Sequence, residues 1–270
     1  MEKYTRENFH THSTFCDGKN SPEEMVLSAI DKGFTALGFS GHGYTPFDLI
    51  SCMKDTDGYI AEVQRLKVKY RDRIKIYLGV EEDSLAPVDR DRFDYIIGSS
   101  HCFLKNGEYF PIDLSHSHFK KCLEVFDYDA VKMAEAYYSA FSTYIKHRRP
   151  DIIGHFDLIT KYDELDDLRL LSNTEYNKTA EKYLLEVIGY GCIFEVNTGA
   201  ISRGLRTSVY PSENLLHLLK KHDAHILLSS DSHRADTLDY FFDEACNYLY
   251  DIGFREFYSP FGKQKINIKR

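Results

Sequence analysis

Two pairs of side chains that bind metals lie near opposite ends of the 270-residue sequence. His10 and His12 follow a short apolar and polar stretch, and Asp231 and His233 follow an apolar run at 224–228. Residues two apart in a β-strand project from the same face, so each pair can reach one metal ion without distorting the backbone. Strands that end side by side would bring the two pairs together. The pattern indicates a metalloenzyme.

Further donor side chains follow four more of the predicted strands. One lies in the loop after the first strand, and the rest stand at strand ends: Asp17, His42, Glu81, His101 and His155. The carboxyl ends of barrel strands form one face, and active sites lie there. Nine converging donors are too many for one ion and suit two or three.

The secondary structure that positions these residues alternates short apolar runs with longer amphipathic ones. Predicted strands cover 8–12, 36–40, 74–80, 95–99, 152–155, 192–197 and 225–229, with a weaker eighth at 254–258. A helix should begin after Ser21, with proline at its first position and acidic residues in its first turn, and end at Gly33. Other predicted helices cover 59–70, 130–147, 174–189, 212–222 and 237–249.

The alternation predicts an α/β fold. Seven or eight β–α units in about 260 residues match the size of a (β/α) barrel. An open, doubly wound sheet is the main alternative, and periodicity does not separate the two. The sequence contains no linker, low-complexity tract or repeat, so we predict one domain over residues 1–270.

Composition limits the class of protein. The formal charge of −8 disfavours an extended nucleic-acid surface. No apolar run approaches the roughly 18 residues that span a bilayer, and the polar N-terminus does not resemble a signal peptide. Six scattered cysteines without a Cys-x-x-Cys pair predict reduced, mostly buried thiols that are not zinc ligands, in a cytoplasmic protein.

The remaining histidines are predicted to be surface or capping residues. His116 and His118 repeat the His-x-His spacing but lie in a polar stretch that no predicted strand precedes. The others are His147, His217, His222 and His225. One such pair is weak evidence for metal binding, and the argument depends on the same pattern recurring at six strand ends.

The ordered motifs resemble those of the polymerase and histidinol phosphatase (PHP) family. They are His10-Thr11-His12-Ser13, Asp17-Gly18, Gly41-His42, Glu81 after an apolar strand, Ile97-Gly98-Ser99-Ser100-His101, Gly154-His155-Phe156-Asp157 and Ser230-Asp231-Ser232-His233. The resemblance runs from residue 9 to about 234. Residues 195–199, followed by Arg203 and Tyr210-Pro211-Ser212, are similar to the branch of histidinol-phosphate phosphatases.

The resemblance implies a distorted (β/α)7 barrel with three divalent metal ions at the strand ends. It implies that His10, His12, Glu81 and Asp231 bind the first ion, and that Glu81 bridges to a second, held by His101 and His155. The third would be bound by Asp17, His42 and His233. Asp17 stands where some relatives have histidine, and Glu82 should point away from the site. Zinc, manganese and iron all occur in the family, and mixed nitrogen and oxygen ligands fit each of them.

The same resemblance implies a phosphomonoesterase of histidine biosynthesis, which converts L-histidinol phosphate and water to L-histidinol and phosphate with a metal-bridging hydroxide as nucleophile. It makes Arg203 a phosphate clamp, with Lys161 as a second contact and Arg206 a weaker candidate. Residues in the loop after the fourth strand could border the substrate: Glu108, Tyr109, Phe110 and Asp113. No general acid for the leaving group is identified.

Three alternatives remain open from the sequence. The first is a PHP-family phosphatase or phosphodiesterase that acts on nucleotides or other small phosphate esters. The second is a proofreading exonuclease, which the acidic charge and the lack of room for a polymerase domain disfavour. The third is a non-catalytic barrel that senses or stores metal, which predicts closed coordination without room for a substrate.

Overall fold

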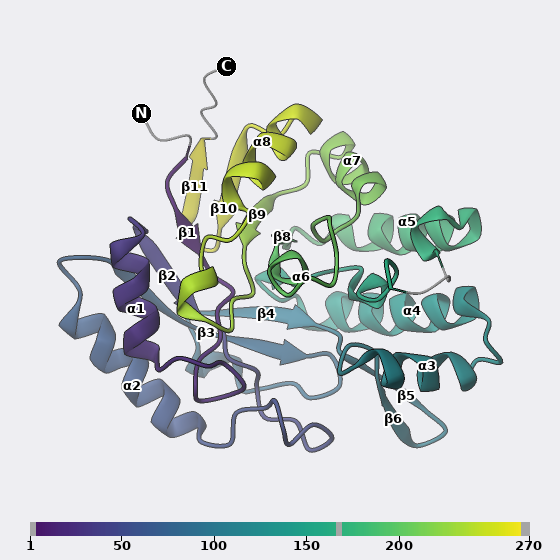
Figure 1. The fold of residues 1–270 in the computed structure, drawn as a ribbon, viewed down its shortest axis with the longest axis horizontal. Coiled ribbons are helices and arrows are strands. Elements are labelled where there is room, and N and C mark those ends of the chain that lie inside the picture. Colours follow the sequence, from purple (N-terminus) through teal and green to yellow (C-terminus); the bar gives the residue numbers. More distant parts are fainter. Residues whose placement is uncertain (1–3, 166–168, 266–270) are drawn as a thin grey trace.

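Seven parallel strands form the central sheet of the protein (Figure 1). The structure is a computed structural model and describes residues 4–165 and 169–265. In sheet order the strands are β1 (Glu7–Asn8), β2 (Ala36–Phe39), β3 (Lys75–Asp83), β4 (Tyr95–Ser99), β7 (Ile152–Ile153), β8 (Ile193–Asn197) and β9 (Ile226–Ser229).

The sheet nearly closes into a barrel. Thr11 bridges Ser232 in parallel register, beyond the ends of β1 and β9. The His12 amide donates to the Ser232 carbonyl at 2.9 Å, and the Ser232 amide donates to the His10 carbonyl at 3.2 Å. The predicted distorted (β/α)7 barrel is therefore confirmed, and the open doubly wound sheet is excluded.

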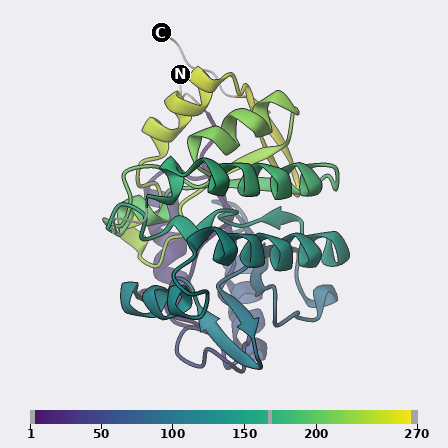
Figure 2. The same ribbon diagram turned by 90° about the vertical axis from the view of Figure 1, so that its right-hand side faces the viewer.

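Helices cover the outside of the sheet (Figures 1 and 2). Their bounds are α1 (Pro22–Asp31), α2 (Thr56–Lys69), α3 (His116–Glu124), α4 (Ala130–Arg148), α5 (Thr174–Ile188), α6 (Gly199–Ser202), α7 (Glu213–Lys221) and α8 (Phe242–Ile252). In Figure 2, α4, α5 and α7 stack along one side of the barrel. Among the described residues, no helix combines the length and apolarity needed to cross a membrane.

The start of α1 follows from its sequence. The Ser21 hydroxyl accepts from the Glu24 amide, and the Glu24 carboxylate accepts from the Ser21 amide, so both halves of a capping box are present. Pro22 takes the first helical position, as predicted. Gly33 has φ +75°, which lets the chain turn from α1 into β2.

Tyr95 fills the barrel interior beneath the strand ends. Its hydroxyl donates to the carbonyls of Phe9 and Phe39 at 2.5 and 3.2 Å. A Cβ atom on Gly79 would lie 2.2 Å from the ring, and one on Gly38 would lie 2.3 Å from the hydroxyl. Glycine is therefore required at both positions, and the ring packs below the Glu81 end of β3.

The first strand is shorter than predicted. It ends at Asn8, and His10 and His12 lie in an extended segment beyond it. The Asn8 side chain explains the interruption, because its oxygen accepts from the His10 amide at 3.1 Å and its nitrogen donates to Ser230 and Leu238. The two imidazoles still lie together, with ring centroids 5.2 Å apart.

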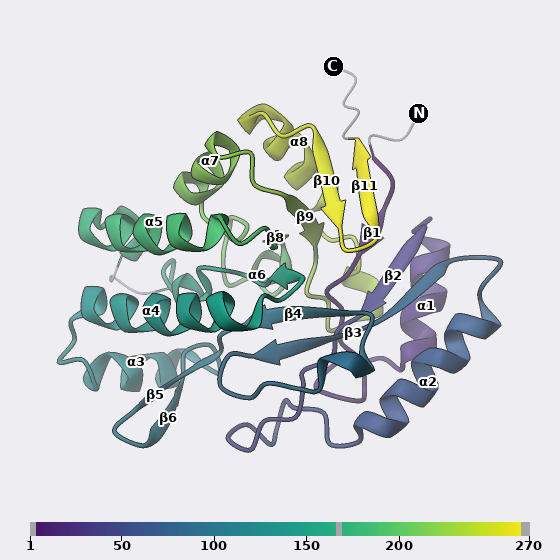
Figure 3. The same cartoon turned by 180° about the vertical axis from the view of Figure 1, so that it is seen from behind.

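Two hairpins and two helices, α3 and the short α6, were not predicted. Strands β5 (Cys102–Lys105) and β6 (Glu108–Pro111) pair around Asn106 and Gly107, which both have positive φ. Helix α3 begins at His116, after the Ser115 cap, where the sequence indicated a loop. The predicted eighth strand is β10 (Glu256–Ser259), which among the described residues pairs with β11 (Gly262–Lys265) alone and lies outside the seven-stranded sheet, as Figure 3 shows.

The last helix starts five residues later than predicted. Residues 235–237 form a 3-10 turn, and Phe241 has φ +63°, which is incompatible with a continuous α-helix. Helix α8 therefore begins at Phe242 and extends to Ile252. The other predicted helices lie within three residues of their observed ends.

Candidate metal centre

Glu81 lies at the centre of the candidate site, near the end of β3. Its two carboxylate oxygens face different groups of histidines. Oε1 lies 3.2 Å from His101 Nε2 and 3.0 Å from His155 Nε2. Oε2 lies 2.9 Å from His42 Nδ1, 3.3 Å from His10 Nε2 and 3.5 Å from His12 Nε2. A carboxylate divided in this way can bridge two ions.

Asp231 forms a second carboxylate centre across the barrel seam. Its Oδ1 lies 3.6 Å from His10 Nε2, 3.2 Å from His12 Nε2 and 3.6 Å from His233 Nδ1. The φ of Asp231 is +48°, in the left-handed region. Asp231 lies two residues after the end of β9. From this left-handed conformation its side chain reaches the imidazoles of both His10 and His12.

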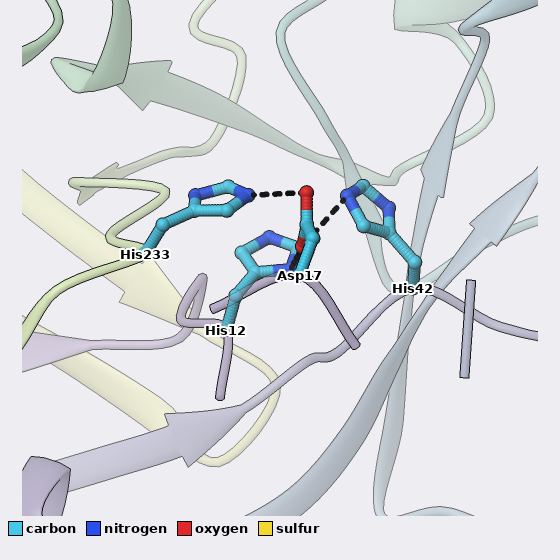
Figure 4. A group of neighbouring side chains, drawn as sticks. All are labelled: His12, Asp17, His42 and His233. Atoms are coloured by element: carbon cyan, nitrogen blue, oxygen red, sulfur yellow. Dashed lines mark ion pairs between the residues drawn. The ribbon is translucent and has the colours of Figure 1, made fainter. Parts of the chain in front are cut away.

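Asp17 lies among three imidazoles at the exposed side of the cluster (Figure 4). Its carboxylate oxygens lie 3.2 Å from His233 Nε2, 3.7 Å from His42 Nε2 and 3.7 Å from His12 Nδ1. The three rings come from the segments after β9, β2 and β1, so this group forms only when the barrel closes.

All nine predicted residues lie in four overlapping groups whose ligand atoms are within 4.8 Å of one another. The groups are His10, His12 and Asp231; His10, Glu81 and His155; His42, Glu81 and His101; and His12, Asp17, His42 and His233. The grouping differs in detail from the sequence expectation, because His12 also borders the Asp17 group and His42 also borders the Glu81 group.

The donor atoms fit a metal ion better than they fit one another. Among the described residues, five buried atoms of the nine side chains have no hydrogen-bond partner. One is His155 Nδ1, and the other four are Nε2 of His10 and of His12, Oε2 of Glu81 and Oδ1 of Asp17. These four lie close to other ligand atoms, yet without hydrogen-bond geometry. Unpaired buried polar groups are costly in free energy, and ligation of a cation would satisfy all four.

The charges of the cluster are strongly coupled. Burial raises the pKa of Glu81, but His10, His101 and His42 together hold it well below its usual range. Burial also raises the pKa of Asp231, and Arg203 and His10 outweigh that effect, so its pKa is well below normal. Both carboxylates are therefore ionised, which is the form that binds metal.

The imidazoles do not share one environment. Burial lowers the pKa of His12 to about 3, with His233 and His42 acting in the same direction. Burial also lowers the pKa of His10, but Glu195, Glu81 and Asp231 outweigh it, and that pKa is raised well above normal. His12 is thus neutral and ready to donate a lone pair.

Glu195 is a site residue that the sequence reasoning did not single out. It lies in β8 with 1% of its surface exposed. Its Oε1 lies 2.5 Å from His10 Nδ1 and accepts from the Ser229 hydroxyl. Its Oε2 accepts from the His155 amide at 2.7 Å and from the Asn197 side chain at 3.0 Å. Such partners orient metal-binding histidines.

Asp83 has the same role for His101 and was also missed. One of its oxygens lies 3.2 Å from His101 Nδ1 and accepts from the His101 amide at 3.0 Å. The only signal in the sequence was its position two residues after Glu81, on the same face of β3. Glu82 points to the opposite face, as predicted, and accepts from both Nε and Nη2 of Arg148 at 2.7 Å.

Arg203 and Lys161 both line the cavity above the cluster. Arg203 Nη2 donates to Asp231 Oδ2 at 2.9 Å, and Nη1 donates to the Asp231 carbonyl at 3.1 Å. Lys161 donates to Asp113 Oδ2 at 3.2 Å and to its carbonyl at 2.9 Å. Each cation therefore has a carboxylate partner and faces the space beside the metal ligands.

Arg206 is not at the surface of the site. It is 3% exposed, donates to Thr160 at 2.6 Å and packs over the Tyr210 ring at 4.4 Å. Those contacts give it a structural role beneath the cavity. Of the four residues named in the loop after the fourth strand, Tyr109 and Asp113 line the cavity.

The other histidines and the cysteines lie outside the metal-ligand groups found among the described residues. His118 Nδ1 lies 2.7 Å from the Ser115 hydroxyl that caps α3, and the His225 ring stacks on Tyr258 at 3.8 Å. All six cysteines are free thiols, and five are buried, as predicted. Cys16 Sγ lies 3.5 Å from His12 Nδ1.

A cavity of about 390 Å³ opens above the cluster and is lined by seven of the nine predicted ligands, all except His10 and His12, together with residues of the surrounding loops. Its size is that of small-molecule sites. The ligand groups therefore open toward space that a substrate can occupy, which contradicts the closed coordination expected of a metal-storage barrel.

Comparisons with known proteins agree with this geometry. The PHP domain model matches residues 8–199, which is well over half of the sequence. The chain belongs to the PHP domain family. The sequence is 28% identical over 269 residues to a "Probable histidinol-phosphatase" of Schizosaccharomyces pombe, covering 90% of this chain and 86% of that protein.

Two solved structures share the PHP barrel described here. A candidate histidinol phosphatase from Listeria monocytogenes aligns with a TM-score of 0.77 at 22% identity, covering 89% of this chain and all of that one. A histidinol phosphate phosphatase from Lactococcus lactis, complexed with zinc, L-histidinol and phosphate, aligns with a TM-score of 0.68 at 19% identity, covering 96% and 98%. At these identities the likeness establishes the fold.

Proposed function

We propose that this chain is a metal-dependent phosphomonoesterase that hydrolyses L-histidinol phosphate to L-histidinol and phosphate. One observation carries the proposal. Nine side chains with nitrogen or oxygen donors, Glu81 and Asp231 among them, gather at the base of a cavity that two cationic side chains also line. The names of the relatives, and the zinc, histidinol and phosphate bound by the Lactococcus protein, support the choice of substrate.

The ligand set supports three divalent ions, with zinc, manganese or iron as candidates. Bound in this cluster, such ions would lower the pKa of coordinated water and neutralise phosphate oxygens. His10, His12, Glu81 and Asp231 would form one site. His101 and His155 would complete the second through Glu81, and Asp17, His42 and His233 the third.

The protein's own residues prepare this centre. Glu195 holds the His10 ring through Nδ1 and the His155 backbone through its amide, and both rings have Nε2 toward Glu81. Asp83 holds the His101 ring through Nδ1. The partners of His10 and His101 fix the rotation of these two rings before any ion binds, which lowers the entropy lost on ligation.

Arg203 and Lys161 are suited to bind phosphate oxygens. The Arg203 guanidinium also donates to both Asp231 Oδ2 and its carbonyl, so it orients a ligand as well as facing the substrate. Lys161 adds a second positive charge on the cavity wall. Together they favour a phosphate dianion in a protein whose net charge is −8.

The proposal takes the chain as a single PHP-type barrel that acts on a small phosphate ester rather than on nucleic acid. Steady-state kinetics with histidinol phosphate, a nucleoside monophosphate and an aryl phosphate test the substrate. We expect kcat/KM for histidinol phosphate to exceed the others by at least about 100-fold, from binding energy at the non-phosphate group. Equal values would refute the assignment, and activity that survives exhaustive chelation would refute the metal dependence.

A further inference from the structure

Two connections form the mouth of the cavity, and each lies next to a predicted metal ligand in the sequence. The β2–α2 connection contains His42, and the β5–β6 hairpin begins directly after His101. In Figure 1 both lie along the lower edge of the barrel. Phe47 from the first stacks on Tyr109 from the second, with ring centroids 4.4 Å apart and planes at 16°. The stacked pair joins the two connections across the cavity.

The β2–α2 connection holds a defined shape. The Met53 amide donates to the His42 carbonyl at 3.0 Å, and Met53 is fully buried. Within it, Asp48 Oδ1 accepts from the amides of Ile50 and Ser51 at 3.1 and 3.2 Å. The Asp48 carboxylate is therefore fixed by one oxygen, while the residue lines the cavity.

Asp48 stands apart from the other acidic residues of the cavity wall. Asp17, Glu81 and Asp231 are candidate metal ligands. Asp83 accepts from His101, and Asp113 pairs with Lys161. In the described parts of the chain, the Asp48 carboxylate accepts from backbone amides but forms no hydrogen bond to another side chain and no ion pair, so its charge is not matched by a cationic side chain of the wall.

We propose that Asp48, together with the Phe47–Tyr109 stack, recognises the non-phosphate part of the substrate, an ammonium group beside an aromatic ring. This inference rests on the proposed function and names its specificity residues. A fixed carboxylate pairs with an ammonium group, and stacked aromatic rings offer faces and edges to an imidazole or a cation. The phosphate end lies at the metal ligands and at Arg203, and the cationic end at the mouth.

The decisive variant is Asp48→Asn. Asparagine keeps an oxygen that can accept from the Ile50 and Ser51 amides, so the turn is retained and only the charge is removed. Asp55→Asn is the matched control. Asp55 belongs to the same connection, is exposed, caps α2 by accepting from the Gly58 amide, and does not line the cavity.

Each protein is assayed with histidinol phosphate and with 3-(imidazol-4-yl)propyl phosphate, which lacks only the amine. We expect Asp48→Asn to lower kcat/KM for histidinol phosphate by about 10- to 100-fold and to leave the deaminated ester unchanged. Asp55→Asn should alter neither. Tyr109→Ala should weaken inhibition by L-histidinol about 3- to 10-fold, with inhibition by inorganic phosphate unchanged.

An equal loss on both esters, or no loss on either, would overturn the role of Asp48. The two proposals fail differently. A wild-type protein that does not prefer histidinol phosphate over an aryl phosphate defeats the proposed function. A wild-type protein that has this preference, and keeps it in Asp48→Asn, defeats only the recognition role.

Discussion

Replacing Glu195 with glutamine should weaken metal binding although Glu195 is not a predicted ligand. Its two oxygens accept from four donors: His10 Nδ1 and Ser229 on Oε1, and the His155 amide and Asn197 on Oε2. Glutamine has one oxygen and one NH2 group, so the NH2 group must face N–H or O–H donors at one of these two positions.

The expected size follows from those contacts. Each buried donor left without an acceptor costs about 1–3 kcal/mol, and two are lost, so the free energy of unfolding should fall by about 2–6 kcal/mol. Loss of the partner of a ligating histidine typically reduces metal affinity about 10- to 100-fold, which corresponds to about 1.4–2.7 kcal/mol. Turnover should recover partly at high metal concentration, because the ligands themselves remain.

Glu82→Gln is the matched control. Glu82 is also fully buried, but it accepts from Arg148, Tyr144 and the Val88 amide on the opposite face of β3. It should lose comparable stability and keep zinc affinity within about twofold. Zinc affinity is measured by competition with a chelator, and stability by denaturant unfolding. If Glu195→Gln binds zinc as tightly as Glu82→Gln does, Glu195 does not orient the metal ligands.

Other consequences can be measured separately. His12→Ala and Asp231→Ala should each abolish turnover and reduce bound metal, measured by elemental analysis, with an unchanged far-ultraviolet circular dichroism spectrum; full metal content would contradict this. Arg203→Ala should raise KM and also lower kcat, because Asp231 loses two hydrogen bonds; an unchanged KM removes Arg203 from phosphate binding. Burial raises the pKa of the Cys122 thiol to about 12 and that of the Cys192 thiol to about 11. Their contribution to stability is present below the unfolded value of about 8.5 and declines as pH rises above it. Alkylation at pH 8 should therefore be slow until denaturant is added, and fast alkylation of the native protein would contradict the burial.

The strand ends could be predicted because a parallel barrel converts sequence position into spatial position. A predicted donor residue followed six of the seven apolar runs of the sheet, all except the run at 192–197. The places of His42, His101 and His155 could be predicted without knowing which strands are neighbours in the sheet, because the carboxyl ends of all barrel strands share one face. The same reasoning distinguished Glu81 from Glu82, because adjacent side chains of a strand point to opposite faces.

The hairpin and helix after β4 were missed because their signals are local and short. Asn106-Gly107 is a typical hairpin turn, but the flanking strands have four residues each and exposed side chains at the tip. Helix α3 has nine residues, and His116 and His118 in its first turn make it look polar. Its apolar face is buried against the barrel only in the folded chain.

The residues that support the metal ligands could not be identified from one sequence, for a different reason. Glu195 is one buried acidic residue in a predicted strand, and nothing near it in sequence names His10 as its partner, 185 residues away. The pairing arises because the side chain of Glu195 in β8 and that of His10 in the segment after β1 both project into the barrel interior, where they meet. Spacing along a strand therefore predicts which side chains gather at the candidate metal centre, while the closure of the barrel between Thr11 and Ser232 determines which carboxylates contact them.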